Sequence, residues 1–428
     1  MSKISVKGVI MSTVCNERLT ICYNAWMIFN EDDNYDEQVR QIAERGFNCI
    51  RIEDGAGLLW DVNGGVRDDI LITSPFGKYT KHTAYRVIAE RKRVNLFERL
   101  LRVCKAAKKY GVKVVLSSWF FLHTNWFCEE KDTKPKFELS TREKFAFFAD
   151  ELSKILGELR KENLIDIVAY AEIFNELDGL YFVRECASSQ EIREMHEAEI
   201  GKLKSAHPDI LFAVDVCTGG VDPELIPRNI DVFNFHCYYL WDIYDEFEKD
   251  VVQWSLDEPV IPEETRCFLK NEIVSVKEVA DAMGADAEAG LKTGLDWPRR
   301  ISLYVSIDEK KQDELSSFLD AKLKEKNEFF REKMHTGIER GLETHRKAVP
   351  NSKIVLGEGA TYCASPSLTF ERDSESFWSI INEQMAYLRE MGFWGSVTST
   401  THSPNRISAW EPCKDRYVRA NNIFKGEK

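Results

Sequence analysis

Short apolar runs alternate with longer amphipathic segments along most of the chain. A short apolar run is typical of a buried strand, and apolar residues that recur every three or four positions are typical of a helix. The strands predicted in this way cover 19–24, 48–52, 113–118, 165–174, 210–216, 231–237, 353–356 and 392–398. The predicted helices cover 36–44, 93–110, 141–161, 190–206, 313–347, 374–391 and 416–424.

Strands that alternate with helices favour βα units and a parallel sheet. Eight strands without a Gly-rich dinucleotide fingerprint favour an α/β fold of the (β/α)8 TIM-barrel type over a doubly wound sheet. We expect one barrel domain over residues 1–428. Two segments are too long for ordinary turns, namely the polar loop 54–90 after the second strand and an insertion at about 239–312 after the sixth.

Charge and cysteine usage narrow the classes of partner. The net charge of −13 repels phosphate backbones and anionic lipids, so neither nucleic acid nor a membrane surface is an expected partner. The N-terminal segment lacks the apolar core of a secretion signal, and no run is long enough to span a membrane, so we expect a cytoplasmic protein. Accordingly, the cysteines are expected to be reduced and buried, as at Cys22, Cys49, Cys104 and Cys237.

The candidate chemistry lies at the carboxyl ends of the predicted strands, where TIM barrels have their active sites. Asn175 and Glu176 follow the fourth strand, and Glu358 follows the seventh. A single glutamate at a strand end is more often a surface or capping residue, because loops are polar. Two glutamates on strands well separated around the ring are more informative, since their side chains can face each other across the barrel mouth.

This arrangement resembles the retaining glycoside hydrolases of clan A, which include the family 5 cellulase-like barrel enzymes. The resemblance covers most of the chain as strand order. At the residue level it rests on CIRIE with Arg51, FNE with Glu176, HCYY with His236 and Tyr238, and GEG with Glu358. It implies that Glu176 is the acid/base and Glu358 the nucleophile. It further implies that Asn175 hydrogen-bonds the sugar 2-hydroxyl, Tyr238 contacts the nucleophile and His236 lines the sugar subsite; a satisfied core histidine is the alternative for His236.

Cleavage of a glycosidic bond needs one protonated carboxyl, which gives its proton to the departing oxygen, and one ionised carboxylate, which attacks the sugar. A free glutamic acid has a pKa of ~4.3, so the acid needs an apolar setting and a nearby negative charge. The nucleophile needs a neighbouring cation. Arg51, inside an apolar strand, is the candidate, and a structural ion pair with Glu53 or Asp54 is the alternative.

Aromatic side chains stack on the apolar faces of sugar rings, so Trp119 after the third strand and Trp410 beyond the eighth are candidate subsite residues. Core or loop packing is the alternative for each. The sequence departs from the clan pattern in two places. Trp394 falls near the start of the eighth strand rather than at its end, and the third strand lacks an obvious family histidine, since His123 comes a few residues late.

The expected function is hydrolysis of β-linked glycosides or short oligosaccharides by double displacement, with a carbohydrate as partner, no cofactor and no metal. The enlarged loops fit a closed pocket and exo-action. A carbohydrate-binding pseudoenzyme and a transglycosidase with the same two glutamates remain alternatives. A third is another barrel enzyme, such as a lyase or a metal-dependent hydrolase or isomerase, and a chelator would discriminate a metal-dependent one. The sugar, the linkage and any homo-oligomer stay open.

Overall fold

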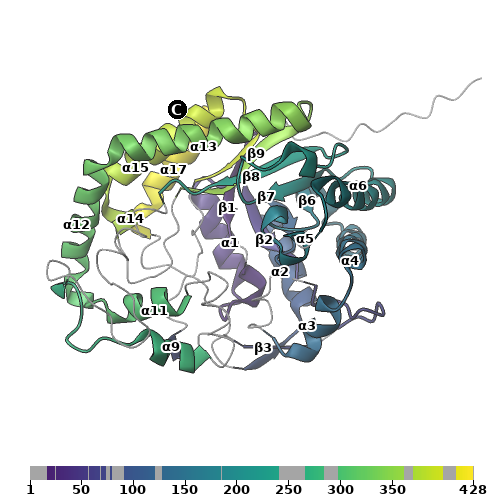
Figure 1. The fold of residues 1–428 in the computed structure, drawn as a ribbon, viewed down its shortest axis with the longest axis horizontal. Helices are drawn as coiled ribbons and strands as arrows, with labels where there is room; N and C mark the ends of the chain where they lie inside the picture. The colour runs from purple at the N-terminus through teal and green to yellow at the C-terminus, as the bar shows by residue number, and fades with distance from the viewer. Residues whose placement is uncertain are drawn as a thin grey trace, which may run out of the picture.

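The computed structural model describes residues 17–24, 26–55, 57–67, 69–73, 78–79, 91–120, 128–184, 186–240, 266–283, 297–360, 370–398 and 411–427. They contain a closed barrel of eight parallel strands with helices around it (Figure 1). Around the ring the strands are β1 (Leu19–Tyr23), β2 (Cys49–Glu53), β5 (Lys113–Ser117), β6 (Val168–Glu172), β7 (Phe212–Val216), β8 (Val232–Cys237), β9 (Lys353–Gly359) and β10 (Gly395–Val397). The predicted TIM-barrel fold is confirmed.

The longer helices follow these strands along the chain. They are α1 (Tyr35–Glu44), α2 (Leu96–Lys109), α4 (Thr141–Lys161), α6 (Ser189–Ala206), α12 (Gln312–Glu325), α13 (Asn327–Ala348), α15 (Glu375–Glu390) and α17 (Lys414–Lys425). Several begin after a polar side chain that accepts a hydrogen bond from the first helical turn, which satisfies a backbone N–H without an intrahelical partner. The caps include Asn34, Asn95, Ser140, Ser188 and Ser374.

Several predicted elements differ from the structure. The helix predicted from 93 begins at Leu96, because Lys92–Val94 forms a strand that pairs with Ile70–Ile72. The helix predicted over 313–347 is two helices, α12 and α13, because Lys326 leaves the helical conformation with φ −105° and ψ 17°. Buried residues continue in phase across the break, from Leu323 to Phe330, so the apolar pattern gave no sign of it. The strand predicted from 165 begins with a 3-10 turn at Ile165–Ile167. The last strand is shorter than predicted, because Gly392 in the left-handed conformation belongs to the preceding turn.

Two apolar cores follow from the barrel. One lies between the strands and the surrounding helices. The other fills the lower part of the barrel interior, where inward-facing residues of the strands meet. The inner core comprises Leu19, Ile21, Cys49, Val115, Tyr170, Ala213, Val232, Val355, Trp394 and Val397. Above it, toward the carboxyl ends of the strands, the inward-facing residues become polar.

The remaining described elements lie mainly in the connections. The antiparallel pair β3 (Ile70–Ile72) and β4 (Lys92–Val94) follows β2, and α9 (Val276–Met283) and α11 (Trp297–Ser306) follow β8. The short helices are α3 (Glu130–Phe137), α5 (Tyr181–Arg184) and α14 (Phe370–Asp373). Parts of 54–90 and of 239–312 lie outside the described residues, so the enlarged loops and the single-domain organisation stay predictions.

Two further expectations concern cysteines and membranes. Cys22, Cys49, Cys104 and Cys237 are free thiols and buried, as predicted. Within the ranges that the structure describes, no helix has the length and apolar character needed to cross a bilayer.

Candidate active site

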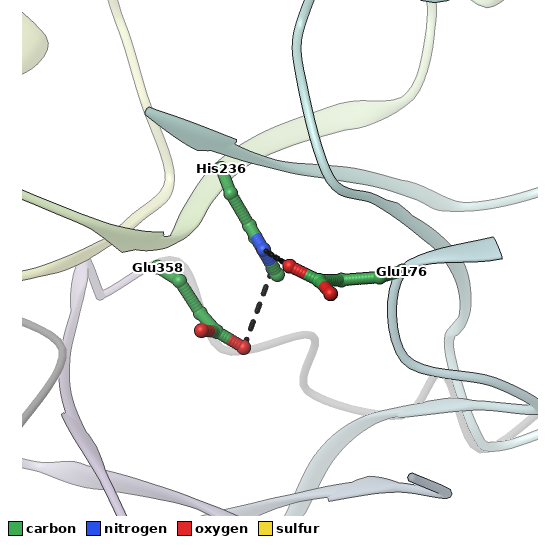
Figure 2. A group of neighbouring side chains, drawn as sticks. All are labelled: Glu176, His236 and Glu358. Carbon is green, nitrogen blue, oxygen red and sulfur yellow. Dashed lines mark hydrogen bonds and ion pairs between the residues drawn. The ribbon is translucent and has the colours of Figure 1, made fainter. Parts of the chain in front are cut away.

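Two glutamates and a histidine meet at the carboxyl end of the barrel (Figure 2). Glu176 follows β6, His236 belongs to β8, and Glu358 belongs to β9. The Nδ1 atom of His236 lies 2.9 Å from Glu176 Oε1, and its Nε2 atom lies 3.6 Å from Glu358 Oε1. An oxygen of Glu176 and an oxygen of Glu358 are within 4.8 Å of each other. The structure thus brings together the two glutamates that the sequence singled out.

An irregularity between β8 and β9 aims Glu358 into the barrel. Phe235 pairs with Leu356, but the next residue, His236, pairs with Glu358, so Gly357 is an extra residue in β9. Regular alternation would point Glu358 to the opposite side from Gly357, and the extra residue re-aims it inward. Gly357 itself has to be glycine, because a Cβ there would lie 2.1 Å from Asn234 Oδ1.

Glu176 is held in an uncommon backbone conformation. Its φ of 48° and ψ of 59° lie in the left-handed region, which non-glycine residues seldom adopt. Its backbone N–H donates to Asp215 Oδ1 at 2.6 Å, a charge-assisted bond from the neighbouring strand β7. Such strain persists only where surrounding contacts enforce it, so Asp215 helps to fix the position of the Glu176 carboxyl.

Arg51 is fully buried at the centre of the polar layer. Its Nη1 donates to Glu358 Oε1 at 2.7 Å. Its Nη2 donates to Glu172 Oε2 at 2.8 Å and to Asp215 Oδ2 at 3.0 Å. These ion pairs answer the open question about Arg51: it touches Glu358, and its other carboxylate partners are residues that the sequence analysis had not considered.

Asp215, Glu172 and Asn234 are the buried polar residues that sequence reasoning missed. Asn234 Nδ2 donates to Glu172 Oε1 at 2.7 Å and to Asp215 Oδ2 at 2.6 Å, and all three side chains are fully buried. A signal was present, because each is a polar residue within an apolar strand, as in FAVDV and FNF. Buried charges need partners, and the partners lie on other strands.

The surroundings of His236 resemble those of a core histidine with all its hydrogen bonds made more than those of an exposed residue that contacts a sugar. Only 2% of its surface is exposed, and its two ring nitrogens lie 2.9 Å from carboxylate oxygens of Glu176 and Asp215. Burial alone would lower the pKa of His236. The charges of Asp215 and Glu358 and the hydrogen bonds outweigh burial and raise this pKa well above its ordinary value. The raised pKa favours the imidazolium form of His236, in which both nitrogens donate to these carboxylates.

The acidic groups respond to burial in different ways. Burial and the nearby charges of Glu176 and Asp215 raise the pKa of Glu358, although His236 and Arg51 oppose the rise. Burial would also raise the pKa of Asp215, but the cations His236 and Arg51 prevail and lower it. The surroundings thus favour the ionised form of Asp215 beside the two cations, and they favour the ionised form of Glu358 less.

The other predicted site residues have mixed surroundings. Tyr238 is half-buried and its hydroxyl donates a short hydrogen bond to Glu358 Oε2. Asn175 Oδ1 accepts from Arg51 Nη2 at 2.6 Å. Trp119 is half-buried, and its ring packs on Trp26 with centroids 4.3 Å apart. Trp410 lies outside the described residues, as does His123.

The same three side chains could also hold a metal ion. One carboxylate oxygen from each glutamate and one ring nitrogen of His236 are close enough to share a cation. Imidazole and carboxylate are common metal ligands when the imidazole is neutral. Here the charges of Asp215 and Glu358 raise the pKa of His236 against the effect of burial, which favours its protonated form, and Arg51 already supplies a positive charge to Glu358. The local charge therefore favours the proton and the guanidinium over a divalent cation.

Comparison with known proteins finds likeness in solved structures alone: no family model and no curated protein matches. A predicted glycoside hydrolase of Parabacteroides distasonis is 16% identical, with a TM-score of 0.61 over 95% of this chain and 93% of that chain. A family 5 mannosidase of Rhizomucor miehei is 11% identical, with a TM-score of 0.47 over 96% and 94%. An exo-β-1,4-mannosidase of an Opitutaceae bacterium is 14% identical, with a TM-score of 0.47 over 94% and 59%. At such low identities the first similarity establishes a shared fold, and the two lower scores add nothing to it.

Proposed function

We propose that this chain is a retaining glycoside hydrolase that cleaves β-linked glycosides or short oligosaccharides. The observation that carries the proposal is the approach of Glu176 and Glu358 to within 4.8 Å between oxygens at the barrel mouth. Retaining enzymes place their two carboxyls ~5–5.5 Å apart, and inverting enzymes ~6.5–9.5 Å apart to admit a water. The short separation favours direct attack by a carboxylate on the sugar.

In the first step, a Glu358 oxygen forms a bond to the anomeric carbon while the bond to the glycosidic oxygen breaks. Glu176 gives its proton to that oxygen, so the leaving group departs as an alcohol. In the second step, water gives a proton to Glu176 and its oxygen bonds to the anomeric carbon. Glu358 then leaves as a carboxylate, and the two inversions restore the β configuration.

The surrounding groups have roles that follow from their contacts. Arg51 and Tyr238 donate to different oxygens of Glu358, so they stabilise the carboxylate before attack and again when it leaves. His236 donates to Glu176 Oε1, which leaves the second carboxyl oxygen to carry the transferred proton. Asn175, oriented by Arg51, is the candidate partner of the sugar 2-hydroxyl, and Trp119 and Trp410 are candidate stacking residues.

The test is hydrolysis of a panel of nitrophenyl α- and β-glycosides. We expect the wild type to turn over a β-glycoside and Glu358→Ala to be inactive. Glu272 provides a matched control, because it also follows an asparagine but its side chain is exposed. The variant Glu272→Ala should therefore keep full activity. Proton NMR of the first product should show the β anomer; an initial α anomer would exclude the retaining mechanism.

Glu176→Ala separates the two glutamates. It should slow substrates with poor leaving groups by on the order of 10²–10⁴, and it should spare activated aryl glycosides, whose departure needs little protonation. Equal loss on both kinds of substrate would contradict the assignment of Glu176 as the acid. A transglycosidase would share the first step, and products formed with an added sugar acceptor would reveal it.

A metal-dependent hydrolase is the second candidate function, because Glu176, His236 and Glu358 could hold a cation. A chelator would abolish that activity and leave the two-glutamate mechanism unchanged. Restoration of chelated enzyme by a divalent cation would favour this candidate over the glycosidase.

A further inference from the structure

The segment that carries the proposed acid is anchored on both sides of Glu176. On the amino-terminal side, the backbone N–H of Asn175 donates to the carbonyl of Ser118, after β5, at 2.8 Å. On the carboxyl-terminal side, the chain makes a 3-10 turn, η5 (Leu177–Gly179), whose first residue is fully buried. Glu176 lies between these anchors in its left-handed conformation, so the direction of its carboxyl depends on both of them.

Two aspartates join this segment to β7 through reciprocal hydrogen bonds. In the first, the backbone N–H of Glu176 donates to Oδ1 of Asp215, a residue of β7, at 2.6 Å. In the second, the backbone N–H of Cys217, directly after β7, donates to Oδ1 of Asp178 in η5 at 2.7 Å. Hydrogen bonds to an ionised group are roughly twice as strong as those between neutral groups. Each backbone is thus held by a carboxyl group of the other, and we call Asp178 and Asp215 together the aspartate clamp.

The bonding partner of Asp178 distinguishes it from an ordinary turn residue. An aspartate in a turn commonly bonds to its own backbone about two residues further on, whereas Asp178 binds Cys217, 39 residues away on the next strand. Burial is the main cause that raises the pKa of Asp178, and the nearby charge of Glu176 adds to the rise. The carboxyls of Asp178 and Glu176 are therefore neighbours, and the aspartate clamp lies at the acid itself.

The residue that Asp178 holds also contacts the acid. The thiol of Cys217 hydrogen-bonds the Glu176 carboxyl. Burial raises the pKa of this thiol most, followed by the charges of Glu176 and Asp178, so the neutral S–H form is favoured. A movement of the Cys217 backbone would carry the thiol away from Glu176. Asp178 thus acts on Glu176 by two routes, through the turn that follows Glu176 and through Cys217.

We propose that Asp178 is a positioning residue for the acid, a role that rests on the hydrolase function proposed above. Asp178 holds the carboxyl of Glu176 in the place shown in Figure 2, where it can protonate the departing oxygen. Without Asp178 the backbone of Glu176 would relax, and a misplacement of about 1 Å can lower a rate ~10²-fold. The loss should fall on proton donation alone, because Arg51 and Tyr238 hold Glu358 from other strands.

The experiment compares two β-glycosides of the sugar found in the panel, one with a phenyl and one with a 2,4-dinitrophenyl leaving group. The phenolate needs a proton from the acid, whereas the dinitrophenolate departs with little protonation. Asp178→Ala should lower kcat/KM for the phenyl glycoside by about 10–100-fold and that for the dinitrophenyl glycoside by less than about 3-fold. A merely structural role would lower both values equally, because it would reduce only the amount of folded enzyme.

Two further variants sharpen the test. Asp178→Asn keeps an oxygen that can accept from the Cys217 N–H, so the ratio of the two kcat/KM values should return to within about 3-fold of the wild type. Asp222→Ala is the matched control, because exposed Asp222 also accepts from a backbone N–H, that of Glu224 at 3.0 Å, in the loop after β7. An equal fall of the ratio in this control, an unchanged ratio in Asp178→Ala, or no recovery in Asp178→Asn would overturn the proposal.

A measurement without substrate separates this inference from the proposed function. Amide hydrogen exchange followed by mass spectrometry reports whether the backbone N–H groups of Glu176 and Cys217 stay bonded. Asp178→Ala should speed exchange in the peptides that contain them by about 10-fold, and Asp178→Asn should not. Faster exchange with no hydrolysis of any glycoside by the wild type would contradict the hydrolase and keep the role of Asp178 in placing Glu176. Unchanged exchange, or hydrolysis with equal losses on both substrates, would do the reverse.

Discussion

The interior of the barrel has two layers of opposite character, built from the same strands two residues apart. On β2, β6 and β7 the lower layer holds Cys49, Tyr170 and Ala213, and the upper layer holds Arg51, Glu172 and Asp215. Both layers are almost completely buried. The lower layer is stabilised by removal of apolar surface from water, whereas the upper layer exists only because each charge has partners on other strands.

The two layers differ in their roles: the apolar layer contributes mainly to stability, and the polar layer holds the side chains of the candidate site. A gap in the apolar layer costs contacts close to the substitution. Loss of one member of the polar layer leaves several buried charges without a partner, and these belong to strands all around the ring. We therefore expect substitutions in the two layers to differ in size, in pH dependence and in their effect on turnover.

Arg51→Met should have the largest effect. It removes the guanidinium that neutralises Glu172, Asp215 and Glu358, so these carboxylates would repel one another in a buried site. Breaking a buried ion pair costs ~3–5 kcal/mol of unfolding free energy, and turnover should be lost. Urea unfolding followed by tryptophan fluorescence measures the cost. If Arg51→Met lowered the free energy of unfolding only as much as an apolar truncation does, the two layers would not differ in the way proposed.

Asp215→Asn should come next. The amide carries no charge to pair with Arg51 and His236 or to hold the backbone N–H of Glu176. The carboxyl of Glu176 would therefore shift, and a misplacement of about 1 Å can lower the rate ~10²-fold. The pKa of Asp215 is lowered in the folded state from 3.8. Its contribution to stability is therefore full above that value and is lost as the pH falls through the folded pKa. The difference in unfolding free energy between wild type and variant should shrink only in acid.

Val115→Ala is the matched substitution in the apolar layer. The loss of two methyl groups from a fully buried side chain should cost about 2 kcal/mol, with little change in kcat for the best glycoside. Because no titrating group is involved, the cost should be the same from pH 4 to pH 8. A pH-dependent cost would mean that the layers are coupled.

Tyr238→Phe should have the smallest effect of the four on the free energy of unfolding. It removes one hydrogen bond to Glu358, and bonds to charged groups are worth ~1.5–3 kcal/mol, so kcat/KM should fall by roughly 10-fold or more. The pKa of Tyr238 is raised by burial and by Glu358, so the hydroxyl stays a donor at neutral pH. The unfolding free energy should change much less than in Arg51→Met, and equal changes would make Tyr238 structural.

Sequence reasoning located the barrel because inner strands of such a fold are buried on both faces and therefore form continuous apolar runs. It located Glu176 and Glu358 because both follow such runs directly. It did not find Asp215, whose importance arises from contacts with β2, β6 and β8 that no local pattern encodes. The extra residue at Gly357 escaped it for the same reason, since only the pairing with β8 makes that glycine exceptional.

The strand that closes the barrel ring is the last strand to be synthesised. Arg51 and its partner Glu358 are 307 residues apart, and the ring closes when β10 pairs with β1. At ~5–20 residues per second, a ribosome needs about 15–60 s to travel from one to the other. During that interval Glu172 and Asp215 can already pair with Arg51, but Glu358 and the two strands that close the ring are missing. The nascent barrel must therefore stay open until its last two strands emerge, and the chain reaches its final fold only after synthesis is nearly complete.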